Sequence, residues 1–117
     1  MNKNRSLGQW GEDLAAKHLQ AMKYDILERN YRAGRSEIDL ICREGETLVF
    51  VEVKTRRSTR QGMPEEALTE RKTEAVIRAA EVYLQTHPSR RIRFDVVAIV
   101  AQPGERPDIL HIRDAFY

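Results

Sequence analysis

A glutamate and a lysine stand out because they interrupt an otherwise apolar, strand-like run at residues 47–54. Glu52 and Lys54 are two residues apart, and side chains alternate between the two faces of a strand. Both therefore point the same way, together with Leu48 and Phe50. Burying a charge is costly unless the charge is paired or holds a metal. The run therefore either ends in a salt bridge or delivers both groups to a site.

A second carboxylate, Asp39, lies thirteen residues earlier in the strand-like run 37–43, although aspartate is disfavoured in strands. The turn at 43–46 predicts a hairpin that makes the two strands neighbours. The register is not fixed by the sequence, so Asp39 either faces Glu52 or lies on a half-solvated face beside an arginine. Convergent carboxylates suit a hard cation such as Mg²⁺, which orients water and stabilises charge on a phosphate. A neighbouring Lys54 would position that water or neutralise the phosphate.

An amphipathic segment before these strands provides another carboxylate. Residues 6–9 fit a capping box, and an apolar stripe predicts a helix over residues 7–22. Glu12 falls on the margin of the stripe. It is either an exposed first-turn glutamate favoured by the helix dipole or a carboxylate aimed along the edge of the core at the same site.

Basic residues follow the central strand at Arg56, Arg57 and Arg60. Such a run is usually a solvated loop, but its start at the strand end that carries Lys54 favours phosphate contact. Pro64 suits the first turn of a helix, and a longer helix is predicted from 69 to 86. Near its start, Lys72 lies on or beside the buried face, as a site residue or as a lysine that extends along the surface to water.

The remaining strands are predicted at residues 24–31, 91–100 and 109–112, followed by a tail that packs through Phe116. The resulting order, α-β-β-β-α-β-(β), predicts a three-layer α/β fold with a mixed central sheet flanked by helices. The chain has 117 residues, which suits a single domain over residues 1–117.

Composition excludes several classes of protein. The chain is 41% hydrophobic and 32% charged, as is typical of folded domains, and its net charge of +2 only weakly indicates an anionic partner. The single cysteine, Cys42, cannot form an internal disulfide, and no signal peptide follows Met1, so a cytoplasmic location is expected. The longest apolar run, residues 96–101, is too short for a membrane span, so no membrane partner is expected.

Several segments together resemble a known family and span nearly the whole chain. They are Gly8-x-x-Gly11-Glu12, Arg29-Asn30, Glu37-Ile38-Asp39-Leu40-Ile41, Phe50-Val51-Glu52-Val53-Lys54-x-Arg56, Lys72 and Arg93-Phe94-Asp95-Val96-Val97. The chain resembles the YraN family of small, largely uncharacterised bacterial proteins. Its Asp and E-x-K residues resemble the PD-(D/E)xK nuclease superfamily, which has the restriction-endonuclease-like fold. The preceding helix glutamate makes the pattern similar to archaeal Holliday junction resolvases, which are small dimeric nucleases.

The resemblance implies a role for each matching residue. Asp39 and Glu52 are expected to bind Mg²⁺ or Mn²⁺, Lys54 to be the catalytic lysine, and Glu12 to be an auxiliary active-site carboxylate. Contacts to nucleic acid are expected from Arg56, Arg57, Arg60 and Lys72. The chain departs from the family at Ser36, where glycine is usual, and from the name of the superfamily at Ile38, where proline would stand.

Three functions are compatible with these residues. The first is a metal-dependent endonuclease that hydrolyses phosphodiester bonds in DNA, with branched or damaged DNA as candidate substrates. A homodimer is expected for it, because cutting both strands together needs two active sites. The second is a nucleic-acid-binding or scaffold protein with a nuclease fold and no useful catalysis, in which Glu52 and Lys54 form an ion-pair network. The third is an interaction domain without nucleic acid. The intact Asp39, Glu52 and Lys54 set favours the first.

Overall fold

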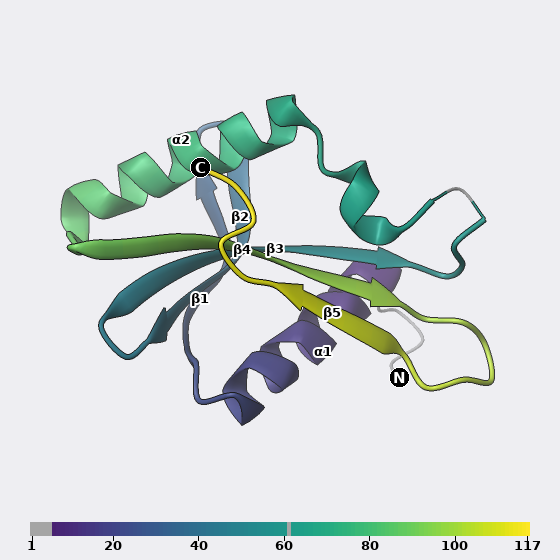
Figure 1. Ribbon diagram of the computed structural model, residues 1–117. Helices are drawn as coiled ribbons and strands as arrows, with labels where there is room; N and C mark the ends of the chain where they lie inside the picture. Colours follow the sequence, from purple (N-terminus) through teal and green to yellow (C-terminus); the bar gives the residue numbers. More distant parts are fainter. Residues whose placement is uncertain (1–5, 61) are drawn as a thin grey trace.

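A five-stranded mixed sheet with one α-helix on each face forms the centre of the computed structural model, which describes residues 6–60 and 62–117 (Figure 1). The predicted order of elements is confirmed, and the helical turn predicted at Pro64 is a short 3₁₀ helix. The elements are α1 (Leu7–Ala21), β1 (Asp25–Ala33), β2 (Ser36–Glu44), β3 (Thr47–Arg56), η1 (Pro64–Ala67), α2 (Glu70–Thr86), β4 (Arg91–Val100) and β5 (Asp108–Ile112).

The strands follow one another across the sheet in chain order, from β1 to β5. Neighbours are antiparallel except β3 and β4, which run parallel because α2 crosses over between them. Gly45 makes the β2–β3 turn at a φ of 59°, a conformation that side chains rarely adopt. The β3–β4 register runs from Thr47 opposite Arg91 to Arg56 opposite Val100. The carboxyl ends of these two central strands therefore lie side by side.

Strand β3 is buried on both faces, as its sequence predicts. Val49, Val51 and Val53 pack on the side of α1, whereas Leu48 and Phe50 pack on the side of α2. The strand therefore separates two apolar cores. Any polar side chain on it that is not at an end needs a partner from a flanking element.

Alternation along residues 37–43 predicts that Ile38 shares a face with Leu40 and Cys42. This prediction is wrong, because Ile38 packs in the core on the side of α2, whereas Leu40 and Cys42 pack on the side of α1. The register of β2 with β3 begins only at Leu40, which lies opposite Val51. Residues before Leu40 do not pair with β3. The alternation of side chains along β3 therefore does not determine the face of the sheet on which they pack.

Helix α1 begins with the predicted capping box. The Ser6 hydroxyl accepts a hydrogen bond from the Gln9 amide and the Ser6 amide donates to the Gln9 side chain, both at 3.1 Å. Gly11 lies so close to β3 that a Cβ at this position would overlap the hydroxyl of Thr55. The absence of a side chain at Gly11 therefore allows α1 to pack directly against β3.

Helix α2 starts after Thr69, whose hydroxyl accepts a hydrogen bond from the Lys72 amide at 3.2 Å. It buries Val76, Ala79, Ala80 and Tyr83 against the other face of the sheet. The predicted tail contact is confirmed, because the Phe116 ring lies 5.1 Å from the Phe94 ring. Within the described residues, no helix combines the length and apolar character that a membrane crossing requires.

Candidate functional site

Asp39 and Glu52 meet where β2 separates from β3. The β2–β3 register begins at Leu40 opposite Val51, and Asp39 is the next residue out. Its carboxylate takes the place of a ladder partner, because Oδ2 accepts a hydrogen bond of 2.8 Å from the Val53 amide. The Asp39 and Glu52 carboxyl groups also share a side-chain hydrogen bond. The register that the sequence leaves open therefore brings the two acids together.

Both carboxyl groups resist ionisation. Glu52 is only 2% exposed, and burial followed by the charge of Asp39 raises its pKa to about 8. Burial also raises the pKa of Asp39, although the Val53 amide and two lysines oppose the effect. A buried pair of acids that cannot easily carry two negative charges is an arrangement that a nearby cation relieves.

Lys54 and Lys72 face this pair of acids. The Lys72 Nζ lies 3.8 Å from Glu52 Oε2. Burial and a hydrogen bond with Lys72 lower the pKa of Lys54. Burial works to lower the pKa of Lys72, but the hydrogen bond with Lys54 and the charges of the two acids together raise it. Lys54 is thus the amine that loses its proton more easily, and Lys72 reaches a buried carboxylate rather than only following the surface.

Glu12 approaches Asp39 from α1. It lies beyond the first turn of that helix and is partly buried, so it is not an exposed first-turn glutamate. Burial and then the charge of Asp39 raise its pKa, while Arg29 and a side-chain hydrogen bond with Asn30 oppose this. Of the two positions considered for Glu12, the structure has the one at the edge of the core near Asp39, and its role in a site stays a prediction.

Two further polar residues join the site from the β1–β2 hairpin, and neither was predicted. Asn30 contacts Glu12 from a backbone position with φ of 52°, which asparagine tolerates better than most residues. Glu37 adds negative charge that raises the pKa of Glu12 and Asp39. Both belong to segments that carry the family resemblance, and that is the only sequence signal that could have indicated them.

Two carboxylates, with a third approaching, are a small ligand set. Within residues 6–60 and 62–117, no three His, Cys, Asp or Glu side chains are grouped closely enough to hold a metal ion. Mg²⁺ is usually bound through one or two carboxylates and completes its coordination with water and phosphate oxygens. The pair Asp39 and Glu52, with its raised pKa values, fits that type of ion.

The predicted phosphate-binding arginines lie at the carboxyl end of β3 and just beyond it. A hollow at the carboxyl end of this strand is lined by Arg56, Arg57 and Arg60. The contacts of Asp39 and Glu52 described above are made by other residues. Lys72, predicted with them, belongs instead to the acid–lysine cluster. The structure thus separates the four basic residues into two groups.

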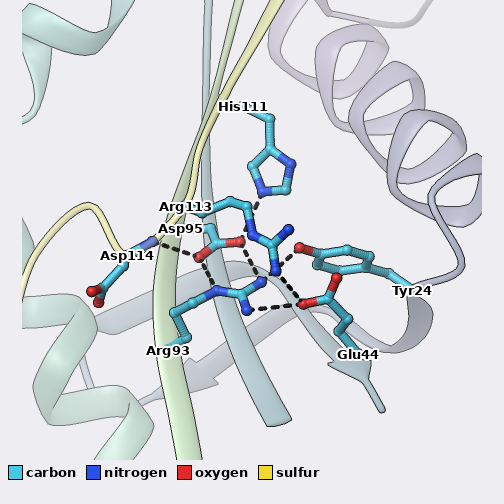
Figure 2. Close-up of polar contacts among 7 residues, drawn as sticks. All are labelled: Tyr24, Glu44, Arg93, Asp95, His111, Arg113 and Asp114. Atoms are coloured by element: carbon cyan, nitrogen blue, oxygen red, sulfur yellow. Dashed lines mark hydrogen bonds and ion pairs between the residues drawn. The ribbon is translucent and has the colours of Figure 1, made fainter.

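A second charged cluster, which sequence reasoning missed, lies on the α1 side of the sheet (Figure 2). Asp95 is 0% exposed and accepts hydrogen bonds from Arg93 Nε at 2.8 Å, His111 Nε2 at 2.8 Å and the Asp114 amide at 3.1 Å. Arg93 also donates to Glu44 at 2.9 Å and to the Tyr24 hydroxyl at 2.6 Å. Burial works to raise the pKa of Asp95, but these hydrogen bonds together lower it.

The sequence signals for this second cluster are the charged Arg93 and Asp95 on one face of the apolar strand β4 and their place in a segment that carries the family resemblance. The spacing is the same as that of Glu52 and Lys54 on β3. Spacing alone therefore does not distinguish the two clusters, and the contacts of each must be compared.

Comparison with known proteins places the chain in a family. The model of the "Uncharacterised protein family UPF0102" matches residues 11–99. A UPF0102 protein of Syntrophomonas wolfei subsp. wolfei is 50% identical over 115 residues, which cover 97% of this chain and 99% of the relative. A UPF0102 protein of Rhodococcus opacus is 47% identical over 118 residues, covering 99% and 100%. The expected membership of a bacterial protein family is confirmed at this level, and the chain belongs to the uncharacterised protein family UPF0102.

Proposed function

We propose that this UPF0102 chain is a metal-dependent endonuclease that hydrolyses phosphodiester bonds in DNA. The observation that carries the proposal is the contact between Asp39 and Glu52, with Lys54 beside them. The order of these residues resembles the PD-(D/E)xK superfamily and is similar to archaeal Holliday junction resolvases. A mixed sheet with a helix on each face is compatible with the restriction-endonuclease-like fold of that superfamily.

Asp39 and Glu52 are the residues that would hold Mg²⁺ or Mn²⁺. Such an ion supplies positive charge for the phosphate and orients a water. The Val53 amide fixes the Asp39 carboxylate at 2.8 Å, so one ligand is in place before any ion arrives. Both acids have raised pKa values, and a divalent cation favours their ionised forms. The proton released from this pair is therefore part of metal binding.

Lys54 contributes an amine whose pKa is lowered, which suits it to accept a proton from the attacking water or to position that water. Lys72 keeps its proton more readily and contributes positive charge near the phosphate. Glu12, held by Asn30, orients water from the side of α1. The interactions of Lys54 and Lys72 with both acids, and of Glu12 with Asp39, support these roles.

Calorimetry tests the metal site. Mg²⁺ or Mn²⁺ should bind to the wild type and not to Asp39→Asn or Glu52→Gln. Glu46→Gln, in the exposed β2–β3 turn, is the matched control because it removes one negative charge away from the site. Absence of metal binding to the wild type, even with DNA present, would contradict the catalytic proposal.

A cleavage screen tests the chemistry. Duplex, single-stranded, flap and four-way DNA are incubated with the wild type, Lys54→Met and the control Lys17→Met, which removes an exposed lysine from α1. We expect Lys54→Met to lose cleavage of the preferred substrate by two orders of magnitude or more, roughly the contribution of general acid–base catalysis. Equal cleavage by the wild type and Lys54→Met would assign the activity to another site or to a contaminant.

A second candidate is a nucleic-acid-binding or scaffold protein without catalysis. The observation in its favour is the ion pair between Lys72 and Glu52 at 3.8 Å, which compensates the buried acid without a metal. This candidate gives no metal binding and no cleavage, but DNA affinity that falls linearly with the logarithm of salt concentration. Salt-independent affinity would argue against phosphate contacts.

A further inference from the structure

The carboxyl ends of β3 and β4 form a second region where a ligand could bind. The two strands are parallel over ten residues and end side by side at Arg56 and Val100. The Ala101 amide donates a hydrogen bond of 2.8 Å to the Arg56 carbonyl, which ties the following loop to this edge. In open α/β sheets, ligands bind beyond the carboxyl ends of parallel strands. Two hollows lie at this edge.

The first hollow is basic. It has a volume of about 400 Å³, and three arginines lie in its wall, Arg56, Arg57 and Arg60. Arg56 Nε and the hydroxyl of Thr55, another lining residue, are buried and have no hydrogen-bond partner within the described part of the chain. Buried donors without acceptors are costly. A phosphate group would supply an acceptor for the Arg56 guanidinium and the negative charge that three guanidinium groups attract.

The second hollow is mainly apolar. It has a volume of about 300 Å³, and its wall includes Trp10, Pro103 and Pro107. Leu7 and Arg57 line both hollows, so the two are contiguous. Trp10 is partly buried, and an aromatic side chain at such a wall is a surface on which a base can stack.

The basic hollow adjoins the proposed active site. Arg56 follows Lys54 by two residues on β3, and both side chains point to the same face. The two backbone positions are therefore about 7 Å apart, a distance that one nucleotide of an extended strand can span. A strand whose phosphate is at Lys54 could thus place a neighbouring phosphate at Arg56.

We propose that the two hollows together bind one unpaired nucleotide of a DNA strand, with its phosphate at Arg56, Arg57 and Arg60 and its base against Trp10. This proposal rests on the proposed function and defines its substrate class as DNA with an unpaired segment. A base inside a duplex is stacked and paired, so it reaches such a wall only at additional cost. A base in a flap or a single strand does not bear that cost.

Trp10 is the only tryptophan in the chain, so its fluorescence reports on the apolar hollow directly. The full chain is titrated without divalent metal with a single-stranded oligonucleotide, a flap, the matching blunt duplex and a free deoxynucleoside monophosphate. Quenching by the single strand and the flap, at concentrations where the duplex has little effect, is the expected result. Equal quenching by the duplex would overturn the proposal. Saturation by the free nucleotide at the same concentration as the strand would identify a mononucleotide site instead and would also overturn it.

Variants separate the two hollows. Arg57→Ala should weaken binding of the single strand and reduce the slope of log affinity against log salt by about 0.7. The matched control is Arg91→Ala, because Arg91 is also exposed but lies at the opposite end of the β3–β4 pair, and it should leave both quantities unchanged. Equal effects of the two substitutions would contradict a phosphate site at the basic hollow.

Trp10→Leu tests stacking with a labelled oligonucleotide and polarisation as the readout. Affinity should fall about tenfold or more for the single strand, and Trp10→Phe should restore most of it. Because Trp10 also packs against the core, circular dichroism must show that each variant is folded. If Trp10→Leu does not fold, the Trp10→Phe and Arg57→Ala data decide. A folded Trp10→Leu with unchanged affinity would overturn the base contact.

The two proposals fail in different ways. If the wild type cleaves DNA but no substrate quenches Trp10, the nucleotide site is wrong and the endonuclease proposal stands. If Trp10 is quenched by unpaired DNA but neither metal binding nor cleavage occurs, the nucleotide site stands and the protein is a binding module. Asp39→Asn should abolish cleavage and leave the quenching intact.

Discussion

Two charged clusters occupy opposite faces of the same sheet and begin from the same sequence feature. Glu52 and Lys54 on β3, and Arg93 and Asp95 on β4, are each an acid and a base separated by one residue on a buried strand. Asp95 is 0% exposed and Glu52 is 2% exposed, so burial does not distinguish the two acids. Their pKa values nevertheless move in opposite directions, lower for Asp95 and upward to about 8 for Glu52.

The difference lies in the partners. Asp95 accepts hydrogen bonds from two side chains and one backbone amide, at 2.8 to 3.1 Å. Glu52 has a second acid as its neighbour and a lysine at 3.8 Å. A buried charge that is fully hydrogen-bonded belongs to the structure, whereas one that remains under strain is a candidate for function. This contrast favours a structural role for the cluster in Figure 2 and leaves the cluster around Asp39 as the candidate for the proposed chemistry.

The largest effect is expected when the cluster around Asp95 loses its acid. Asp95→Ala leaves Arg93 buried and deprives His111 of its partner, so the free energy of unfolding should fall by about 3–5 kcal/mol. Urea denaturation followed by circular dichroism measures the loss. A change below about 1 kcal/mol, the range of exposed ion pairs, would mean that the cluster does not stabilise the fold.

The next largest effect concerns the cluster around Asp39 and Glu52. At a concentration a hundred times its Kd, Mg²⁺ should stabilise the wild type by about 2.7 kcal/mol, because it binds the folded state only. Asp39→Asn should show no such gain, whereas Asp95→Asn, although less stable, should still respond. Thermal denaturation with and without Mg²⁺ measures both. A response that survives Asp39→Asn would place the ion elsewhere.

A smaller effect of opposite sign is expected for Glu52→Gln without metal. At pH 7 the buried Glu52 must take up a proton on folding, at a cost, because its pKa rises from 4.5 to about 8. A neutral glutamine avoids this cost, so the substitution should stabilise the protein by about 0.5–2 kcal/mol while abolishing metal binding. Urea denaturation at pH 7 measures the gain. Destabilisation would mean that the ion pair with Lys72 outweighs the cost of burial.

The pH dependence of stability follows from the same two acids. The pKa of Glu52 rises from 4.5 to about 8 on folding, so its contribution is present below pH 4.5 and is lost as pH rises toward 8. The pKa of Asp95 is lowered from 3.8, so its contribution is present above that value and is lost as pH falls further. Melting temperature is measured against pH for the wild type and both variants. In Glu52→Gln, the fall in melting temperature above pH 4.5 should disappear. In Asp95→Asn, the fall at acid pH should become smaller.

The sequence predicts the elements better than the contacts between them. Alternation defined β3 and β4, and the capping residues Ser6 and Thr69 defined the helix starts, because these signals are local. The sequence predicts that Asp39 and Glu52 lie on neighbouring strands, but not that their carboxyl groups meet. Their contact depends on the residue at which β2 separates from β3. The second cluster could not be predicted, because Tyr24 and Arg93 are 69 residues apart and only the folded sheet brings them together.

The smallest effect is expected at the exposed edge of the cluster around Asp95. Arg113 Nη2 donates to Glu44 at 2.7 Å, the same carboxylate oxygen that Arg93 Nη1 reaches at 2.9 Å, but its side chain is 51% exposed, against 16% for Arg93. Water replaces an exposed partner at little cost, so Arg113→Ala should lower the free energy of unfolding by about 0–1 kcal/mol, and less in high salt. Arg93→Ala, measured in parallel by urea denaturation, should cost several times more, because it leaves Asp95 buried with fewer donors. Equal losses would show that shared contact with Glu44, rather than burial around Asp95, holds this cluster together.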